Sequence, residues 1–161
     1  MRAVLNYCTG GIERSVPAGA LVIREGDTTG HLYILIEGRL EVIKGDTIVA
    51  TITESGAVLG EMSVLLDQPH TATVRAAADS IIYEVDDAAG FLREQPEATL
   101  VIAQLLAQRL NVANTYLADL KRQYAGQGNH LAMVGDVLQR MINLPQSQVS
   151  PGSDLKSDPR L

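Results

Sequence analysis

The chain has 161 residues, an acidic net charge of −6 at pH 7 and a single cysteine, Cys8, and this length fits one domain with a small appendage. The negative charge argues against a nucleic-acid surface, which needs a basic patch, and no apolar run reaches the ~18 residues of a membrane span. Because Cys8 has no disulfide partner and the N-terminus lacks a secretory signal, we expect a cytoplasmic protein without membrane or nucleic-acid partners.

Short strands separated by turn signals are predicted from Glu13 onward. Residues 1–12 contain one apolar piece followed by the breaker Thr9-Gly10-Gly11, and we expect a helical stub there. Aliphatic and β-branched residues, often alternating with polar ones, predict strands at 21–23, 31–36, 39–44, 47–52, 71–76 and 80–85. Several short strands at roughly ten-residue spacing are typical of an antiparallel sandwich or closed barrel.

The stretch 60–76 carries the clearest functional pattern. Gly60 and Glu61 open it, an apolar Leu65-Leu66 pair follows, and an alternating run closes it. A short helix beginning at Gly60 would offer free backbone N–H groups to an anion. The carboxylate of Glu61, in the first turn of that helix, could accept a hydrogen bond from a sugar hydroxyl.

The spacing from Gly60 to His70 resembles the phosphate-binding cassette of cyclic-nucleotide-binding domains, which reads Gly-Glu, a short helix, then Arg-Ser/Thr/Ala-Ala. The resemblance extends over about 16–85 and includes Gly26-Asp27, Tyr33-Ile34-Leu35 and the run from Gly38 to Val42. It implies an α+β fold in which residues 13–95 form an antiparallel β jelly-roll barrel of the cyclic-nucleotide-binding type. Short helices would flank this barrel, and the cassette would occupy 59–75.

The resemblance also implies a cyclic-nucleotide site, with cAMP or cGMP as the expected ligand and no other cofactor. Glu61 would hold the ribose hydroxyl, and Asn114 would contact the purine. The expected binding residues are Gly60, Glu61, Met62, Ser63, His70, Thr71, Ala72, Arg109 and Asn114.

His70 stands where the family has arginine. Arginine holds a phosphate with a permanently charged fork, whereas a mostly neutral imidazole offers at most one donor. Losing one charge-assisted hydrogen bond costs roughly 1.5–3 kcal/mol. Two alternatives follow. Backbone N–H groups, Thr71 and Arg109 still hold a cyclic nucleotide, or the domain has lost the ligand and serves as a protein-interaction module.

A helical pattern begins after Gln95, and we expect one long helix over 96–125. Apolar residues follow the 4,3,4,3,4 spacing of a heptad repeat, which predicts a symmetric homodimer; the alternative is a helix packed on its own barrel. The expected dimer interface is Leu106, Leu110, Ala113, Leu117, Leu120 and Tyr124. The helix also resembles the long dimerisation helix of catabolite activators.

The remaining residues predict a second amphipathic helix over 130–144 and a disordered tail over 145–161. That helix resembles the first helix of a DNA-binding domain, but no recognition helix follows. Ser63 has no histidine base at motif spacing, so we expect no enzyme activity. His31, His70 and His130 lie far apart without a carboxylate or cysteine at ligand spacing, so no metal site is expected. The resulting hypothesis is a stand-alone dimeric sensor under allosteric regulation, which signals to a downstream protein partner.

Overall fold

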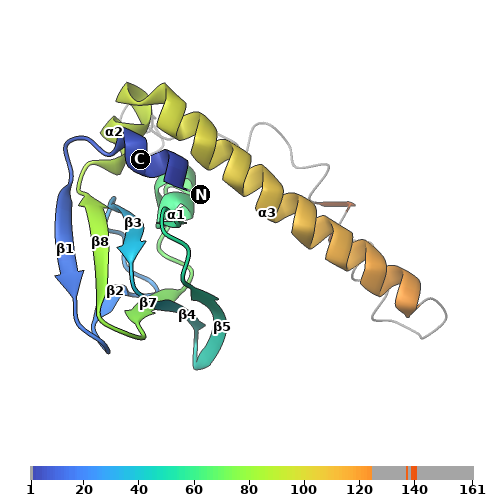
Figure 1. Ribbon diagram of the computed structural model, residues 1–161. Coiled ribbons are helices and arrows are strands. Elements are labelled where there is room, and N and C mark those ends of the chain that lie inside the picture. The colour runs from blue at the N-terminus through green and yellow to red at the C-terminus, as the bar shows by residue number, and fades with distance from the viewer. Residues whose placement is uncertain (1, 125–136, 138, 141–161) are drawn as a thin grey trace, which may run out of the picture. The chain divides into compact units, whose positions relative to one another are not determined.

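The computed structural model in Figure 1 describes residues 2–124, 137, 139 and 140. Two compact units divide the chain, and the boundary between them falls between Ile102 and Ala103. The described part of the first unit holds eight strands, a 3-10 helix, two short helices and the beginning of a long helix. The second unit begins within that long helix.

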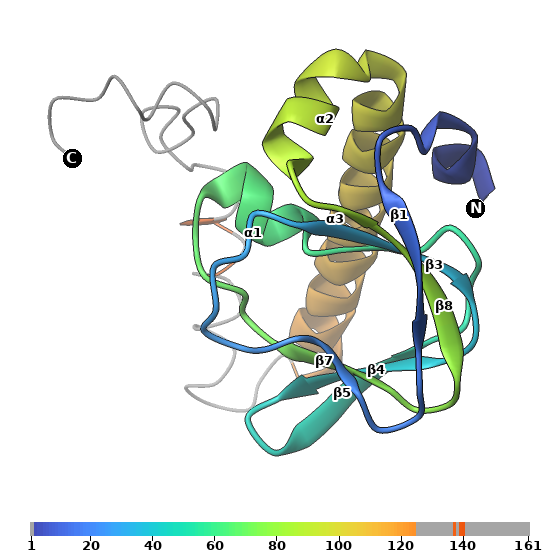
Figure 2. The same cartoon turned by 90° about the vertical axis from the view of Figure 1, so that its left-hand side faces the viewer.

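All strand pairings in the first unit are antiparallel, and they form two four-stranded sheets. One sheet has the order β1-β8-β3-β6, and the other has the order β2-β7-β4-β5. Figure 2 shows β7, β4 and β5 lying below β1, β8 and β3. The strands are β1 (Ile12–Val16), β2 (Leu21–Ile23), β3 (Leu32–Glu37), β4 (Leu40–Lys44), β5 (Thr47–Ile52), β6 (Val58–Leu59), β7 (Thr73–Ala76) and β8 (Ser80–Val85).

This strand order is that of a two-sheet jelly roll. The predicted antiparallel fold with a few helices is therefore confirmed. The described pairings place the strands in two separate sheets, and a closed barrel is not shown.

Aliphatic side chains fill the core between the sheets. Leu35, Leu40 and Ile82 are fully buried there, together with Val16 and Val74. β3 does not alternate between buried and exposed positions, because four consecutive residues from Leu32 are buried. A strand covered on both faces loses the period-two pattern. β3 is therefore an interior strand of its sheet, between β8 and β6.

The helices of the described part are η1 (Arg2–Tyr7, a 3-10 helix), α1 (Glu61–Leu66), α2 (Ala88–Glu94) and α3 (Pro96–Gln123). The carboxylate of Asp87 caps α2 by accepting a hydrogen bond from the backbone N–H of Gly90, with an O–N distance of 2.9 Å. The hydroxyl of Thr99 donates to the carbonyl of Leu92 at 2.5 Å and so ties the first turn of α3 to α2. Among the described helices, none combines the length and hydropathy needed to cross a bilayer.

Several boundaries differ from those that the sequence predicts. β1 and β6 are not among the predicted strands, and β7 begins at Thr73 rather than at Thr71. β1 is an edge strand with only Val16 buried, so its sequence shows no buried alternation. The predicted helix over 130–144 and tail over 145–161 lie outside the described residues, apart from three helical positions at 137, 139 and 140.

Candidate functional site

Gly60 sets the direction in which the chain enters α1. It is the N-cap residue of α1, with φ 85° and ψ −8°, a left-handed conformation that glycine adopts without steric cost. A Cβ atom at this position would lie 2.9 Å from the carbonyl oxygen of His31 and 3.5 Å from the Cε1 atom of His70. Any side chain at position 60 would therefore have both a strained backbone and no room.

The first turn of α1 carries two buried polar residues. Glu61 is 4% exposed and Ser63 is 7% exposed, whereas Met62 between them is 48% exposed. The hydroxyl of Ser63 donates to the carbonyl of Gln68 at 2.5 Å, which closes the loop that follows the helix. Burying a carboxylate costs free energy. Glu61 is therefore a buried carboxylate at the start of α1.

His70 lies inside the protein, close to Gly60. The residue is 5% exposed, and its Nε2 atom lies 2.9 Å from the hydroxyl oxygen of Thr29. Its backbone pairs with the β2–β3 connection, since its N–H donates to Asp27 and its carbonyl accepts from Gly26. Burial lowers the pKa of His70 below 6.5; the charge of Asp27 acts in the opposite direction with a smaller effect. At pH 7 the ring is therefore neutral.

Lys44 adds a positive charge at the end of the cassette, and the sequence gives no signal for this contact. Its Nζ atom donates to the carbonyl oxygen of Thr71 at 2.7 Å and lies 4.0 Å from a carboxylate oxygen of Glu25. The pairing of β4 with β7 brings Lys44 to the cassette, because Ile43 lies opposite Thr73. The loop at Thr71, which is itself exposed, thus has a cation beside it.

The structure brings most of the expected binding residues into one strand–helix–loop segment. Gly60, Glu61, Met62 and Ser63 form the beginning of α1, and His70, Thr71 and Ala72 form the loop that leads to β7. Arg109 and Asn114 lie on α3 in the second unit. Their contact with a ligand stays a prediction.

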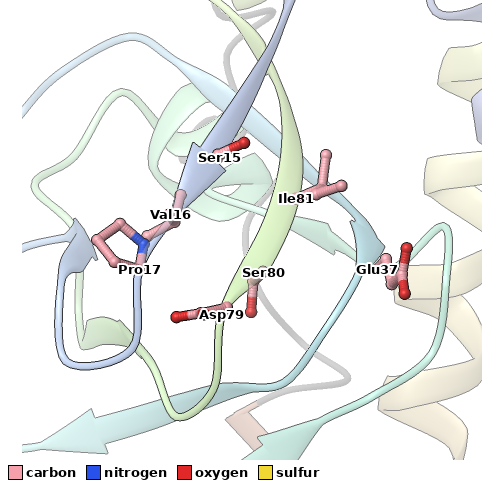
Figure 3. Close-up of a pocket in the computed structure, with 7 residues that line it drawn as sticks. All are labelled: Ser15, Val16, Pro17, Glu37, Asp79, Ser80 and Ile81. Carbon is pink, nitrogen blue, oxygen red and sulfur yellow. The ribbon is translucent and has the colours of Figure 1, made fainter.

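A hollow of about 430 Å³ lies elsewhere, at the turn between β1 and β2 and the beginning of β8 (Figure 3). Its polar groups hold the local turns together. The Asp79 carboxylate accepts a hydrogen bond from the backbone N–H of Ala18, and the Ser80 hydroxyl donates to the carbonyl of Ala78. We assign no function to this hollow, because it contains no cassette residue. Its lining residues are Ser15, Val16, Pro17, Glu37, Asp79, Ser80 and Ile81.

His31 corrects one expectation from the sequence. Its Nδ1 atom lies 3.0 Å from Oε1 of Glu84 and 3.9 Å from Oδ1 of Asp86. The spacing along the chain led us to expect no carboxylate near His31, and this expectation is wrong. The partners are more than fifty residues away in sequence, and the antiparallel pairing of Leu32 with Val85 brings them together.

Residues 13–93 match the family model of the cyclic nucleotide-binding domain. Human cGMP-dependent protein kinase 2 is 30% identical over 73 residues, which cover 45% of this chain and 9% of the kinase. The type II regulatory subunit of cAMP-dependent protein kinase from Drosophila melanogaster is 26% identical over 152 residues, which cover 88% of this chain and 40% of the subunit. The chain therefore spans less than half the length of either relative.

Among solved structures, the catabolite activator protein of Thermus thermophilus superposes on this fold with a TM-score of 0.61 and 27% sequence identity. The match covers 73% of this chain and 56% of the activator. It thus extends beyond the cassette.

Proposed function

Because this chain belongs to the cyclic nucleotide-binding domain family, we propose that its cassette binds a cyclic purine nucleotide, cAMP or cGMP, and that the domain acts as a regulatory sensor. The observation that carries the proposal is the pair Gly60-Glu61. A left-handed glycine leads into a helix whose first residue is a carboxylate only 4% exposed. A fixed acceptor of this kind suits a ribose hydroxyl.

The phosphate would lie near the loop 70–72 in this proposal. Loop backbone groups, the hydroxyl of Thr71 and the charge of Lys44 are the available partners, since Lys44 already touches the carbonyl of Thr71. An exposed lysine is a weaker and more strongly screened partner than the arginine that the family places in the cassette. We therefore propose a sensor with lower affinity than a cassette with arginine would give.

The purine would be contacted from α3. The side-chain oxygen of Asn114 has no hydrogen-bond partner among the described residues, and an amide presents both an acceptor and donors to the edge of a base. We propose that the bound nucleotide changes the position of α2, which begins directly after β8, and that α3 transmits the change. Such a shift requires contacts that differ between the two states, and Arg109 and Asn114 would supply them.

We further propose that the protein is a homodimer joined through α3. Within the predicted stripe, Leu110 is 48% exposed and Tyr124 is 45% exposed, so large apolar side chains of this helix remain accessible to solvent. Contiguous apolar patches that remain exposed mark surfaces that bind a partner. The 4,3,4,3,4 spacing favours a second copy of the same helix as that partner.

The second candidate function is a protein-interaction module without a ligand. The observation in its favour is the ring of His70, which is buried and hydrogen-bonded to Thr29 and whose pKa is lowered by burial. The two functions differ in one measurable property. A ligand that binds only the folded state raises the free energy of unfolding, by about 2.7 kcal/mol at a concentration of one hundred times its Kd. The melting temperature rises with it.

Glu61→Gln tests the proposed function directly. The substitution keeps the size of the side chain but replaces a charged acceptor with a neutral one, so we expect about fivefold weaker binding of cAMP or cGMP, a change of about 1 kcal/mol. Fluorescence-monitored melting and calorimetric titration with both nucleotides give the readout. Glu54→Gln is the matched control, because Glu54 is exposed and lies outside the cassette. Equal affinities for Glu61→Gln and wild type would exclude the ribose role of Glu61.

A further inference from the structure

We propose that His31, Glu84 and Asp86 form a binding site for a divalent metal ion of the zinc or manganese type. His31 directly precedes β3, Glu84 lies near the end of β8, and Asp86 follows that strand. One ligand atom from each residue lies within 4.8 Å of the other two. This proposal does not depend on the cyclic-nucleotide function, because none of the three residues belongs to the cassette.

The distance between His31 and Glu84 fits ligands of a single ion. An ion held at about 2.1 Å by nitrogen and carboxylate oxygen places neighbouring ligand atoms about 3.0–3.4 Å apart in octahedral or tetrahedral geometry. The Nδ1 atom of His31 is 3.0 Å from the Glu84 oxygen and 3.9 Å from the Asp86 oxygen. The second distance is longer than an ion requires, so Asp86, whose side chain is 70% exposed, would have to turn toward His31 to bind the ion.

Arg14 fixes the orientation of the Glu84 carboxylate. Its Nε atom lies 2.7 Å from Oε2 of Glu84, which leaves Oε1 directed toward His31. Groups that hold the ligands in this way determine much of the affinity of a metal site. Arg14 also offsets one of the two carboxylate charges, so a divalent ion would meet one uncompensated negative charge rather than two.

The chemistry of the three ligands selects the class of metal. An imidazole nitrogen with two carboxylate oxygens suits zinc, manganese and related transition metals better than calcium or magnesium, which favour oxygen ligands alone. Three protein ligands leave an open coordination position for water. The hydroxyl of Tyr33 lies 3.5 Å from Nδ1 of His31, close enough to interact with such a water.

The site adjoins the beginning of the cassette. The carbonyl oxygen of His31 lies 2.9 Å from the point where a Cβ on Gly60 would stand. A metal bound to the His31 ring would therefore restrain the backbone against which Gly60 packs.

Calorimetric titration of tag-free protein with ZnCl2 at pH 7, without any nucleotide, tests the proposal. We expect one ion per chain, and we expect Asp86→Asn and His31→Ala each to lower the affinity at least tenfold. Asp46→Asn is the matched control, since Asp46 is an exposed carboxylate in the turn between β4 and β5. Should His31→Ala fail to fold, Asp86→Asn still gives the answer, because its side chain is exposed. Wild-type zinc affinity in Asp86→Asn, or no zinc binding by the wild type below millimolar concentration, would show that these residues form an ion pair only.

Discussion

We expect His70→Arg to bind cAMP or cGMP about ten- to a hundredfold more tightly than the wild-type protein. The substitution introduces a permanently charged fork at the position where a cyclic phosphate is proposed to lie, and one charge-assisted hydrogen bond contributes about 1.5–3 kcal/mol. In the wild type the same position holds a neutral ring, because burial lowers the pKa of His70 below 6.5. Calorimetric titration of both proteins measures the difference, and circular dichroism verifies that the variant folds.

The pH dependence of binding gives a second readout on the same residue. A bound cyclic phosphate would favour the imidazolium form and raise the pKa of His70 in the complex above its value in the free protein. Affinity should therefore rise as the pH falls through the pKa of the complex and level off below the pKa of the free protein. Since the latter is below 6.5, we expect the rise to continue below pH 6.5.

His70→Arg should show no such dependence, because arginine keeps its charge throughout this range. The matched control is His70→Gln, which keeps a hydrogen-bonding side chain at the position of the ring but carries no charge at any pH. It should bind more weakly than wild type at low pH and should also lack the dependence. If His70→Arg binds no better than wild type, and wild-type affinity does not change between pH 8 and pH 5.5, then residue 70 does not contact the phosphate.

We expect Leu117→Glu to convert a dimeric protein into a monomer. Leu117 lies at the middle of the predicted heptad stripe on α3, and the substitution would place a carboxylate opposite its own copy in a dry interface. A buried charge without a partner costs several kcal/mol, and a symmetric seam would bury two of them. Size-exclusion chromatography with light scattering at tens of micromolar protein gives the mass directly.

Leu100→Glu is the control for this experiment. Leu100 is also on α3, is 59% exposed and lies outside the stripe, so the same change there should leave the dimer intact. A wild-type protein that elutes as a monomer would disprove the dimer. A Leu117→Glu protein that remains dimeric would place the interface elsewhere.

Local sequence signals were sufficient to predict much of the fold. The aliphatic and aromatic residues between Ser80 and Val85 predict a strand with the same bounds as β8. The cassette is equally local. Gly60 is the N-cap of α1 and Glu61 is its first residue, so two neighbours in the sequence are enough to place this part of the site.

Contacts between residues distant in sequence could not be predicted. Thr29 meets His70, Lys44 meets Thr71, and Glu84 meets His31 only because strand pairing joins these parts of the chain. The periodicity of apolar residues and the local composition indicate which residues are buried, but they do not indicate which strands pair with each other. The direction of the His70 ring could not be predicted for the same reason. Its partner Thr29 lies in a turn made of glycine and polar residues, which have no pattern that points to His70. β6 has two residues, too few for any period to be recognised.

Calorimetric titration of the wild-type protein with cAMP and with cGMP is the most direct test of the proposed sensor, with His70→Arg titrated in parallel. We expect saturable binding of at least one of the two nucleotides, with one site per chain and a higher melting temperature in its presence. The tighter binding of His70→Arg should make the same site visible at lower ligand concentration. No heat and no thermal shift at millimolar ligand, for the wild type and for His70→Arg alike, would contradict a cyclic-nucleotide site and favour the interaction module.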